Sequence, residues 1–100
     1  MNQNFYQFLG LAARARKVVS GEDTVIRGIK SKRFYLVLIS SDASENTKKQ
    51  FEDKCRYYEV PLRQTGTRQD LGTSIGKHER VVLGITDEGF SDKIILMLDE

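Results

Sequence analysis

The hydrophobic and polar positions of this chain change period repeatedly, from the spacing of a helix to that of a strand and back. Between Phe5 and Ala13 the apolar side chains recur at three- and four-residue spacing, which predicts an amphipathic helix over residues 3–14. A second stripe of this kind predicts a helix over about 44–58. Helical and strand-like segments that alternate in this way are typical of a layered α/β domain.

Four apolar segments are expected to form strands. The run Phe34–Ile39 is rich in β-branched and aromatic residues without polar alternation, as expected for a central strand buried on both faces. The run Val81–Ile85 has the same character, and Val18–Val19 is a shorter strand. We expect Val60–Arg63 at a sheet edge, because Pro61 has no N–H group to donate to a neighbouring strand.

Three polar segments predict helix starts by the same arrangement, a capping side chain three residues before a carboxylate. They are Ser20–Asp23, Asp42–Glu45 and Thr67–Asp70. Because the first N–H groups of a helix have no partner within it, such starts are suited to binding anions. The run Ile94–Leu98 has no clear period, but Ser91–Asp92 precedes it like a cap and favours a short final helix.

Length and composition bound the possible classes of protein. One hundred residues, 39% apolar and 30% charged, are expected to form one globular domain over residues 1–100. Apolar runs such as Ile94–Leu98 are far shorter than the roughly 20 residues of a membrane helix, and basic residues interrupt the N-terminal apolar segment. A single cysteine, Cys55, excludes an intramolecular disulfide and fits a reducing compartment, the cytoplasm.

Charge is distributed unevenly, although the formal net charge is only +2. Residues 1–33 hold seven basic and two acidic side chains, whereas residues 34–100 hold nine basic and twelve acidic ones. A chain polarised in this way can present a positive face to phosphate groups. The alternative, a solvated helix surface without a partner, stays open on charge alone.

The basic third contains a candidate phosphate-binding surface at one strand-to-helix junction. Gly21 follows a short strand and opens a helix in which Arg27 and Lys30 lie on one face. Backbone N–H groups and hydroxyls at the helix start would add hydrogen-bond donors for phosphate. Asp23 is explained structurally as a capping carboxylate, but it could also accept hydrogen bonds from the edge of a base. The candidate RNA-binding residues of this junction are Arg16, Lys17, Gly21, Glu22, Asp23, Thr24, Arg27 and Lys30.

The loop Ile75–Arg80 is a second candidate surface. Its RNA-binding candidates are Gly76, Lys77, His78 and Arg80. An ordinary exposed connection would have much the same composition. Only a position beside Ser20 would make the loop functional, and the sequence does not show that position.

Few residues suggest catalysis. Cys55 and His78 lie 23 residues apart without a surrounding motif. Cys55 shares an apolar stripe with Phe51 and Tyr58, which indicates a buried thiol, while a solvated loop histidine is the simpler interpretation of His78. The chain shows neither metal-ligand spacing nor a glycine-rich nucleotide fingerprint. We therefore expect no enzyme, metal, cofactor or small-molecule substrate.

An ordered set of motifs resembles a known superfamily. The motifs are Lys17–Gly21, Tyr35–Asp42, Cys55–Pro61, Asp70–Gly72 and Gly76. In order and spacing they resemble the kink-turn-binding ribosomal proteins of the large-subunit seven-Ae and thirty-e type, and the length suggests the small bacterial YlxQ-like branch. The resemblance implies a three-layer α/β/α sandwich around a mixed four-stranded sheet. It also implies RNA binding by the glycine-led helix start together with the loop before the last strand.

In this superfamily the helix start carries Asn-Glu and a later Lys, which contact tandem G·A pairs of a kinked RNA. The resemblance places Glu22, Asp23 and Ile26 at these positions. Asp23 keeps the chemistry with a shorter side chain, whereas Glu22 replaces an amide with a charge and Ile26 removes the cation. Kink-turn specificity therefore stays open, and general affinity for RNA is what the resemblance implies.

The leading interpretation is a non-catalytic protein that binds structured RNA, acting near ribosomes or in translation. One alternative is a protein-interaction module on the same fold, since Glu22 and Ile26 would suit an interface and the resemblance implies a superfamily that includes members with protein partners. Another is a small hydrolase or transferase, which would need a pocket assembled around His78.

Overall fold

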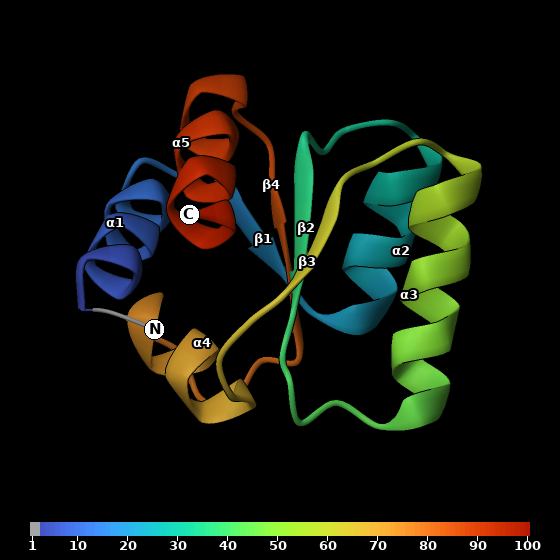
Figure 1. Ribbon diagram of the computed structural model, residues 1–100, viewed down its shortest axis with the longest axis horizontal. Helices are drawn as coiled ribbons and strands as arrows, with labels where there is room; N and C mark the ends of the chain where they lie inside the picture. Colours follow the sequence, from blue (N-terminus) through green and yellow to red (C-terminus); the bar gives the residue numbers. More distant parts are fainter. Residues whose placement is uncertain (1–2) are drawn as a thin grey trace.

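A four-stranded sheet lies between two layers of helices in the computed structural model, which describes residues 3–100 (Figure 1). Helices α1, α4 and α5 lie on one face of the sheet, and α2 and α3 lie on the other. The expected α/β/α sandwich with a mixed sheet is confirmed. The elements are α1 (Gln3–Arg14), β1 (Val18–Ser20), α2 (Glu22–Lys30), β2 (Leu36–Ile39), α3 (Glu45–Tyr57), β3 (Leu62–Gln64), α4 (Arg68–Ser74), β4 (Val82–Ile85) and α5 (Glu88–Asp99).

The strands are ordered β1-β4-β2-β3 across the sheet. β4 runs antiparallel to both β1 and β2, and β3 runs parallel to β2 at the edge. The edge position of this strand is confirmed, and Pro61 immediately precedes its first paired residue. Val18 and Leu36 both pair with Ile85, so the starts of β1 and β2 lie at the same end of the sheet as the end of β4.

β2 is buried on both faces, as its uninterrupted apolar run predicts. Val37 and Ile39 belong to the core cluster beneath α2 and α3, whereas Leu36 and Leu38 belong to the cluster beneath α1, α4 and α5. Residues alternate between the two faces because successive side chains of a strand point in opposite directions. One strand therefore supplies the centre of both cores.

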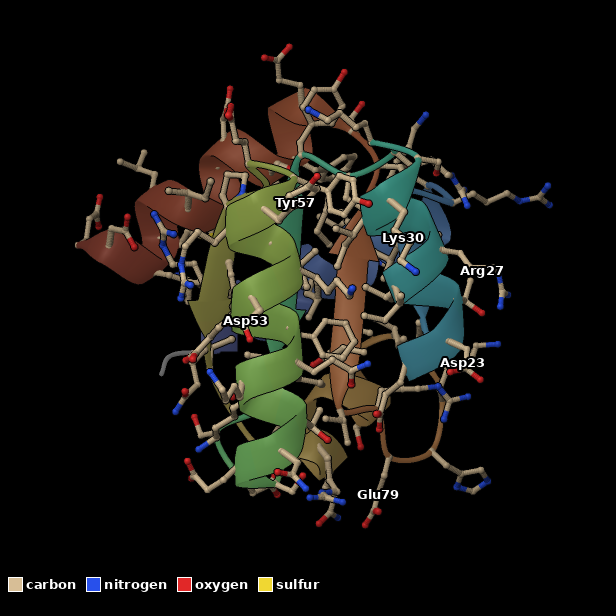
Figure 2. All side chains as sticks on the ribbon, turned by 90° about the vertical axis from the view of Figure 1, so that its right-hand side faces the viewer. Asp23, Arg27, Lys30, Asp53, Tyr57 and Glu79 are labelled. Atoms are coloured by element: carbon tan, nitrogen blue, oxygen red, sulfur yellow. The ribbon has the colours of Figure 1, made fainter. Side chains whose placement is uncertain are left out.

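Phe34 holds α2 close to the sheet. Its buried ring lies between Gly28 of α2 and Gly84 of β4. A Cβ atom at Gly28 would lie 2.3 Å from the ring, and one at Gly84 would lie 2.6 Å from it. The two glycines thus leave the space that the ring fills. Figure 2 shows α2 beside α3 on this side of the molecule.

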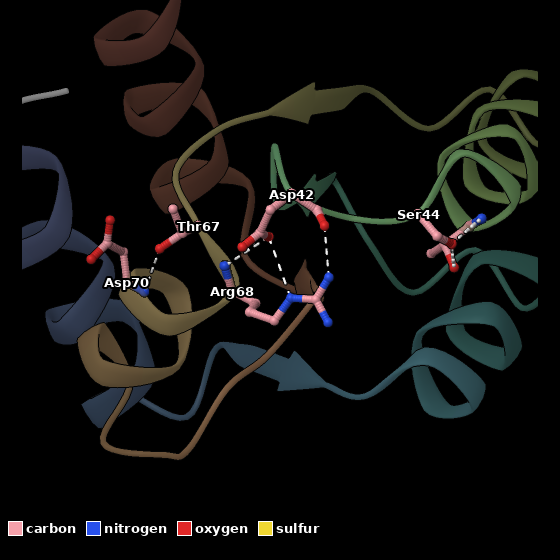
Figure 3. Close-up of polar contacts among 6 residues, drawn as sticks. Asp42, Ser44, Thr67, Arg68 and Asp70 are labelled. Atoms are coloured by element: carbon pink, nitrogen blue, oxygen red, sulfur yellow. Dashed lines mark hydrogen bonds and ion pairs between the residues drawn. The ribbon is translucent and has the colours of Figure 1, made fainter.

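The structure corrects part of the capping prediction (Figure 3). Thr67 does cap α4, accepting a hydrogen bond from the N–H of Asp70 at 3.1 Å. At α3 the cap is Ser44 and not Asp42, since the Ser44 hydroxyl accepts from the N–H of Thr47 at 3.2 Å. The Asp42 carboxylate instead accepts from the backbone N–H of Arg68 at 3.1 Å, which links the ends of β2 and β3. Asp42 therefore does not cap α3, because its carboxylate is bound to the N–H of Arg68 instead.

The final helix is longer than expected. α5 begins at Glu88, and its cap is Asp87, whose carboxylate accepts from the N–H of Phe90 at 2.8 Å. The predicted cap, Ser91, is instead buried inside the helix. The sequence pattern did not predict the first turn of α5, because only one aromatic residue anchors it and one residue gives no periodicity. That residue is Phe90, whose ring packs against Phe8 of α1 at 5.2 Å between centroids.

Candidate nucleic-acid interface

The start of α2 has no side-chain cap. Its N-cap residue is Gly21, with φ 102° and ψ 138°, and no side chain accepts a hydrogen bond from the first turn. The expected capping role of Ser20 is therefore wrong, and so is the structural role of Asp23 as a capping carboxylate. The φ value lies in the region that glycine alone adopts without strain. The N–H groups of the first turn are left open to an outside acceptor.

Ser20 binds a residue of the second candidate surface, the loop Ile75–Arg80, and this contact shows where the loop lies. The guanidinium of Arg80 donates from Nε to the Ser20 hydroxyl at 3.1 Å and from Nη1 to the carbonyl of Glu79 at 2.8 Å. The loop Ile75–Arg80 therefore lies beside the start of α2, the position that the sequence left open. We call Gly21–Arg27 together with Gly76–Arg80 the loop junction.

Two glycines shape the loop half of the junction. A Cβ atom at Gly72 would lie 1.8 Å from the carbonyl oxygen of His78, so only glycine lets α4 pass this close to the loop. Gly76 has φ 73° and nothing within 4 Å of its Cβ position, so glycine is favoured there by the backbone conformation and not by a lack of space. The N–H of Lys77 donates to the Gly72 carbonyl at 2.8 Å. Lys77 and His78 are exposed and line a surface depression of about 550 Å³ with Glu79.

The helix half of the junction presents both signs of charge. Glu22 and Asp23 are exposed in the first turn of α2. The Arg27 guanidinium reaches back toward this turn and donates to the Thr24 hydroxyl at 3.4 Å. Figure 2 shows Asp23 at the same end of the molecule as Glu79, with Arg27 beyond it along α2. Acceptors and a cation are thus available beside the open N–H groups.

Three candidate cations do not lie at the loop junction. Lys17 precedes β1 and its carbonyl accepts from the N–H of Thr86 at 2.9 Å, beyond the end of β4. Arg16 precedes it, and Lys30 ends α2. Lys17 is four residues before Gly21, a distance of about 13 Å along a strand. The sequence pattern groups these three cations with the residues around Gly21, but the fold places them away from the loop junction.

Among the described residues, the cations of the basic third form no ion pair with a carboxylate. Within residues 3–100, every ion pair uses a cation from the later part of the chain: Lys48, Lys49, Arg56, Arg63 and Arg68. The cations before residue 34 take part in none of these pairs. They keep their charge available to a partner from outside the molecule.

Other chemistry finds no support among the described residues. Cys55 is buried, and burial raises the pKa of its thiol from 9.0 to about 11, which confirms a core thiol. In residues 3–100, no cluster of three histidine, cysteine, aspartate or glutamate side chains has the arrangement of a metal site. The same residues include no helix with the length and apolar character that crossing a bilayer requires.

Comparison with known proteins identifies the family. Residues 3–95 match the model of the ribosomal protein L7Ae/L30e/S12e/Gadd45 family. The chain belongs to this family. The RNA-binding protein YlxQ of Bacillus subtilis (strain 168) is 55% identical over 95 residues, which are 95% of each chain. The expected superfamily and its YlxQ-like branch are thereby confirmed.

More distant relatives and solved structures agree. The large ribosomal subunit protein eL30 of Trypanosoma brucei brucei is 34% identical over 84 residues, covering 82% of this chain and 80% of that protein. A structure described as a protein with unknown function from Bacillus halodurans C is 46% identical, with a TM-score of 0.95 over 99% of this chain and all of that one. This member of the L7Ae/L30e family thus has its relatives' fold over almost its full length.

Proposed function

We propose that this L7Ae/L30e-family protein is a non-catalytic, cytoplasmic RNA-binding protein, and that the loop junction contacts structured RNA. The observation that carries the proposal is the Arg80–Ser20 hydrogen bond, which places the exposed loop against the uncapped start of α2. Two segments separated by 60 residues thereby form one surface of N–H donors, cations and carboxylates.

Each group of the junction has a distinct task on RNA. Gly21 keeps side-chain atoms away from the helix start, so that a phosphate can approach the open N–H groups. Arg27 and Lys77 would neutralise further phosphates. The carboxylates of Glu22 and Asp23 would accept hydrogen bonds from base N–H groups, since carboxylates in a basic site can read bases.

The relatives support RNA as the partner and the ribosome as its setting. YlxQ of Bacillus subtilis is named an RNA-binding protein, and eL30 is a protein of the large ribosomal subunit. Structured RNA related to the ribosome or to translation is therefore the proposed target. Kink-turn recognition is a narrower proposal, to be tested by binding to a kink-turn hairpin and to the same hairpin without its tandem G·A pairs.

A protein-interaction module on the same surface has less support. Ile26, the apolar residue that would suit such an interface, is half-buried and packs against the core cluster under α2 and α3. The side chain thus already has apolar neighbours. The exposed residues around it are charged, which favours a polar partner over an apolar one.

Charge reversal tests the junction. We expect Arg27→Glu with Lys77→Glu to weaken binding to RNA recovered by crosslinking in cells by about ten-fold or more, and to reduce the salt dependence by about one unit for each phosphate that is no longer neutralised. Lys93→Glu, on the exposed surface of α5, is the matched control for one reversal. Equal losses in the control, or unchanged binding in the junction variant, would contradict the proposal.

A further inference from the structure

Five exposed cations gather at the end of the sheet opposite the loop junction. The N–H of Thr86 donates to the carbonyl of Lys17, and the N–H of Tyr35 donates to the carbonyl of Ile85, both at 2.9 Å. Lys17 and Tyr35 therefore flank the end of β4, about 10 Å apart across one intervening strand. We call this surface the basic end; its cations are Arg16, Lys17, Lys30, Lys32 and Arg33.

The basic end adjoins the loop junction only through Arg27, which lies with Lys30 in the last turn of α2, and the other residues of the two surfaces lie apart. Figure 2 shows Lys30 at one end of α2, level with Tyr57, and Asp23 and Glu79 at the other. The nine residues of α2 span about 12 Å between these ends. One RNA segment bound at the loop junction can therefore pass the basic end only if it continues beyond the junction.

The cations of the basic end form no ion pairs among the described residues, although Glu59, Asp87 and Glu88 lie at the same end of the sheet. Of the nearby acids at the start of α5, Asp87 is engaged as the helix cap, and Glu88 is exposed. The Arg33 guanidinium lies 5.8 Å from the centre of the Phe34 ring, a contact that leaves its charge available.

Two of these cations occupy strained backbone positions that usually belong to glycine. Arg16 follows α1 with φ 63°, and Lys32 follows α2 with φ 58°. In both turns the next residue's N–H donates to a carbonyl five residues back, the hydrogen bond of a Schellman cap. Gly76 adopts the same conformation after α4, with φ 73°. The fold thus keeps a strained cation where glycine would fit without strain.

Favourable interaction with the helix dipole is the structural alternative, since cations are stabilising near helix C-termini. A third non-glycine residue with positive φ shows that a cation is not generally required after a helix. Glu59 follows α3 with φ 60°, and it carries the opposite charge in the same position. A cation is therefore not needed to end a helix in this fold.

We infer that the basic end is a second RNA-binding surface, which takes the single-stranded extension of an RNA held at the loop junction; this rests on the proposed function. Phosphates of the extension would meet Arg16, Lys17, Lys30, Lys32 and Arg33. Tyr35 is 48% exposed and offers a ring on which a base can stack. The proposed partner is a flexible strand, because the cations come from two turns and one helix end, and a flexible strand can follow charges that do not lie along one element.

The test compares glycine variants at matching positions. Arg16→Gly with Lys32→Gly removes two cations and two strained conformations, whereas Glu59→Gly removes the strain at α3 without removing a cation. The probes are a labelled kink-turn hairpin and the same hairpin with a ten-nucleotide uridine extension. Arg16→Asn with Lys32→Asn is a second variant that tolerates the same backbone.

We expect the extended hairpin to bind the parent protein more tightly than the blunt one. The double glycine variant should lose this gain, binding the extended hairpin about five-fold more weakly with a salt dependence lower by roughly 1.4, while its binding to the blunt hairpin is unchanged. Its melting temperature should not fall, because strain is relieved. Glu59→Gly, which removes an acid at the same end of the sheet, should bind neither probe more weakly than the parent does.

Other outcomes overturn the inference. They are equal binding of the two probes by the parent, binding of neither probe, an unchanged double variant, and an equal loss in Glu59→Gly. An unchanged double variant is also the result expected if the basic end binds an acidic protein instead. Failure of the proposed function would give a different result. The parent would then bind the extended hairpin but not the blunt one, and Arg27→Glu with Lys77→Glu would not change its affinity for the extended hairpin.

Discussion

Gly21 is the residue on which the start of α2 depends, and Gly21→Ala tests that dependence. The position has φ 102° and ψ 138°, outside the regions open to alanine. Space is not the obstacle, because the nearest atom to an added Cβ is the Thr24 hydroxyl oxygen at 3.9 Å. The cost is therefore conformational, about 1–3 kcal/mol for a residue held in such a region.

A loss of this size is measurable by urea or thermal unfolding. It corresponds to a fall in melting temperature of roughly 5–20 °C for a domain of this length. Any relaxation of the strain would turn the peptide before Glu22 and redirect the open N–H groups, so RNA binding should fall as well. Both effects follow from one dihedral angle.

The control is a glycine in the first turn of a different helix. Gly89 of α5 has an ordinary φ, and an added Cβ would lie 3.4 Å from the Asp87 carboxylate, a normal contact. Gly89→Ala should therefore leave stability unchanged or raise it by up to about 1 kcal/mol. A Gly21→Ala protein as stable as the parent, or a Gly89→Ala protein destabilised as strongly, would refute the reasoning.

Further predictions concern two core residues, Cys55 and Gly84. Since burial raises the pKa of the Cys55 thiol from 9.0 to about 11, the folded protein should resist iodoacetamide at pH 8 and react once urea unfolds it. Because the folded pKa is the higher one, the thiol's contribution to stability should be complete below about pH 9 and be lost as the pH rises toward 11, as unfolding curves would show. Gly84→Ala should destabilise by about 1–3 kcal/mol, because its Cβ would lie 2.6 Å from the Phe34 ring. Adding Phe34→Leu should recover part of that loss, and strictly additive effects in denaturant unfolding would contradict the contact.

Local pattern alone determined most of the architecture. The helix over residues 3–14, the doubly buried β2 and an edge strand near Pro61 were all predicted, because each depends on the periodicity or backbone chemistry of its own segment; the strand begins at Leu62 and not at Val60. The buried thiol of Cys55 followed from the apolar stripe on its helix. Motif order was also enough to indicate the family.

Helix starts were predicted less well, because capping side chains compete with tertiary partners. Ser20 and Asp42 both have the side-chain chemistry of a cap, but they are bound to Arg80 and Arg68 instead. These guanidinium and N–H partners lie 60 and 26 residues away, and no local pattern reports them. Asp87 was missed because Phe90 alone anchors the first turn of α5.

The sequence by itself determined that the N-terminal third is basic and that one glycine-led helix start lies within it. Only the tertiary structure decided how those charges are shared between two surfaces. Lys17 and Gly21 are close along the chain, yet an extended strand separates them by about 13 Å, while Ser20 and Arg80 meet because β1 pairs with β4. Strand pairing is the physical reason. It brings segments that are distant in the sequence together, and it holds neighbouring residues of a strand in an extended conformation, so the cations of one basic segment lie at two ends of the sheet.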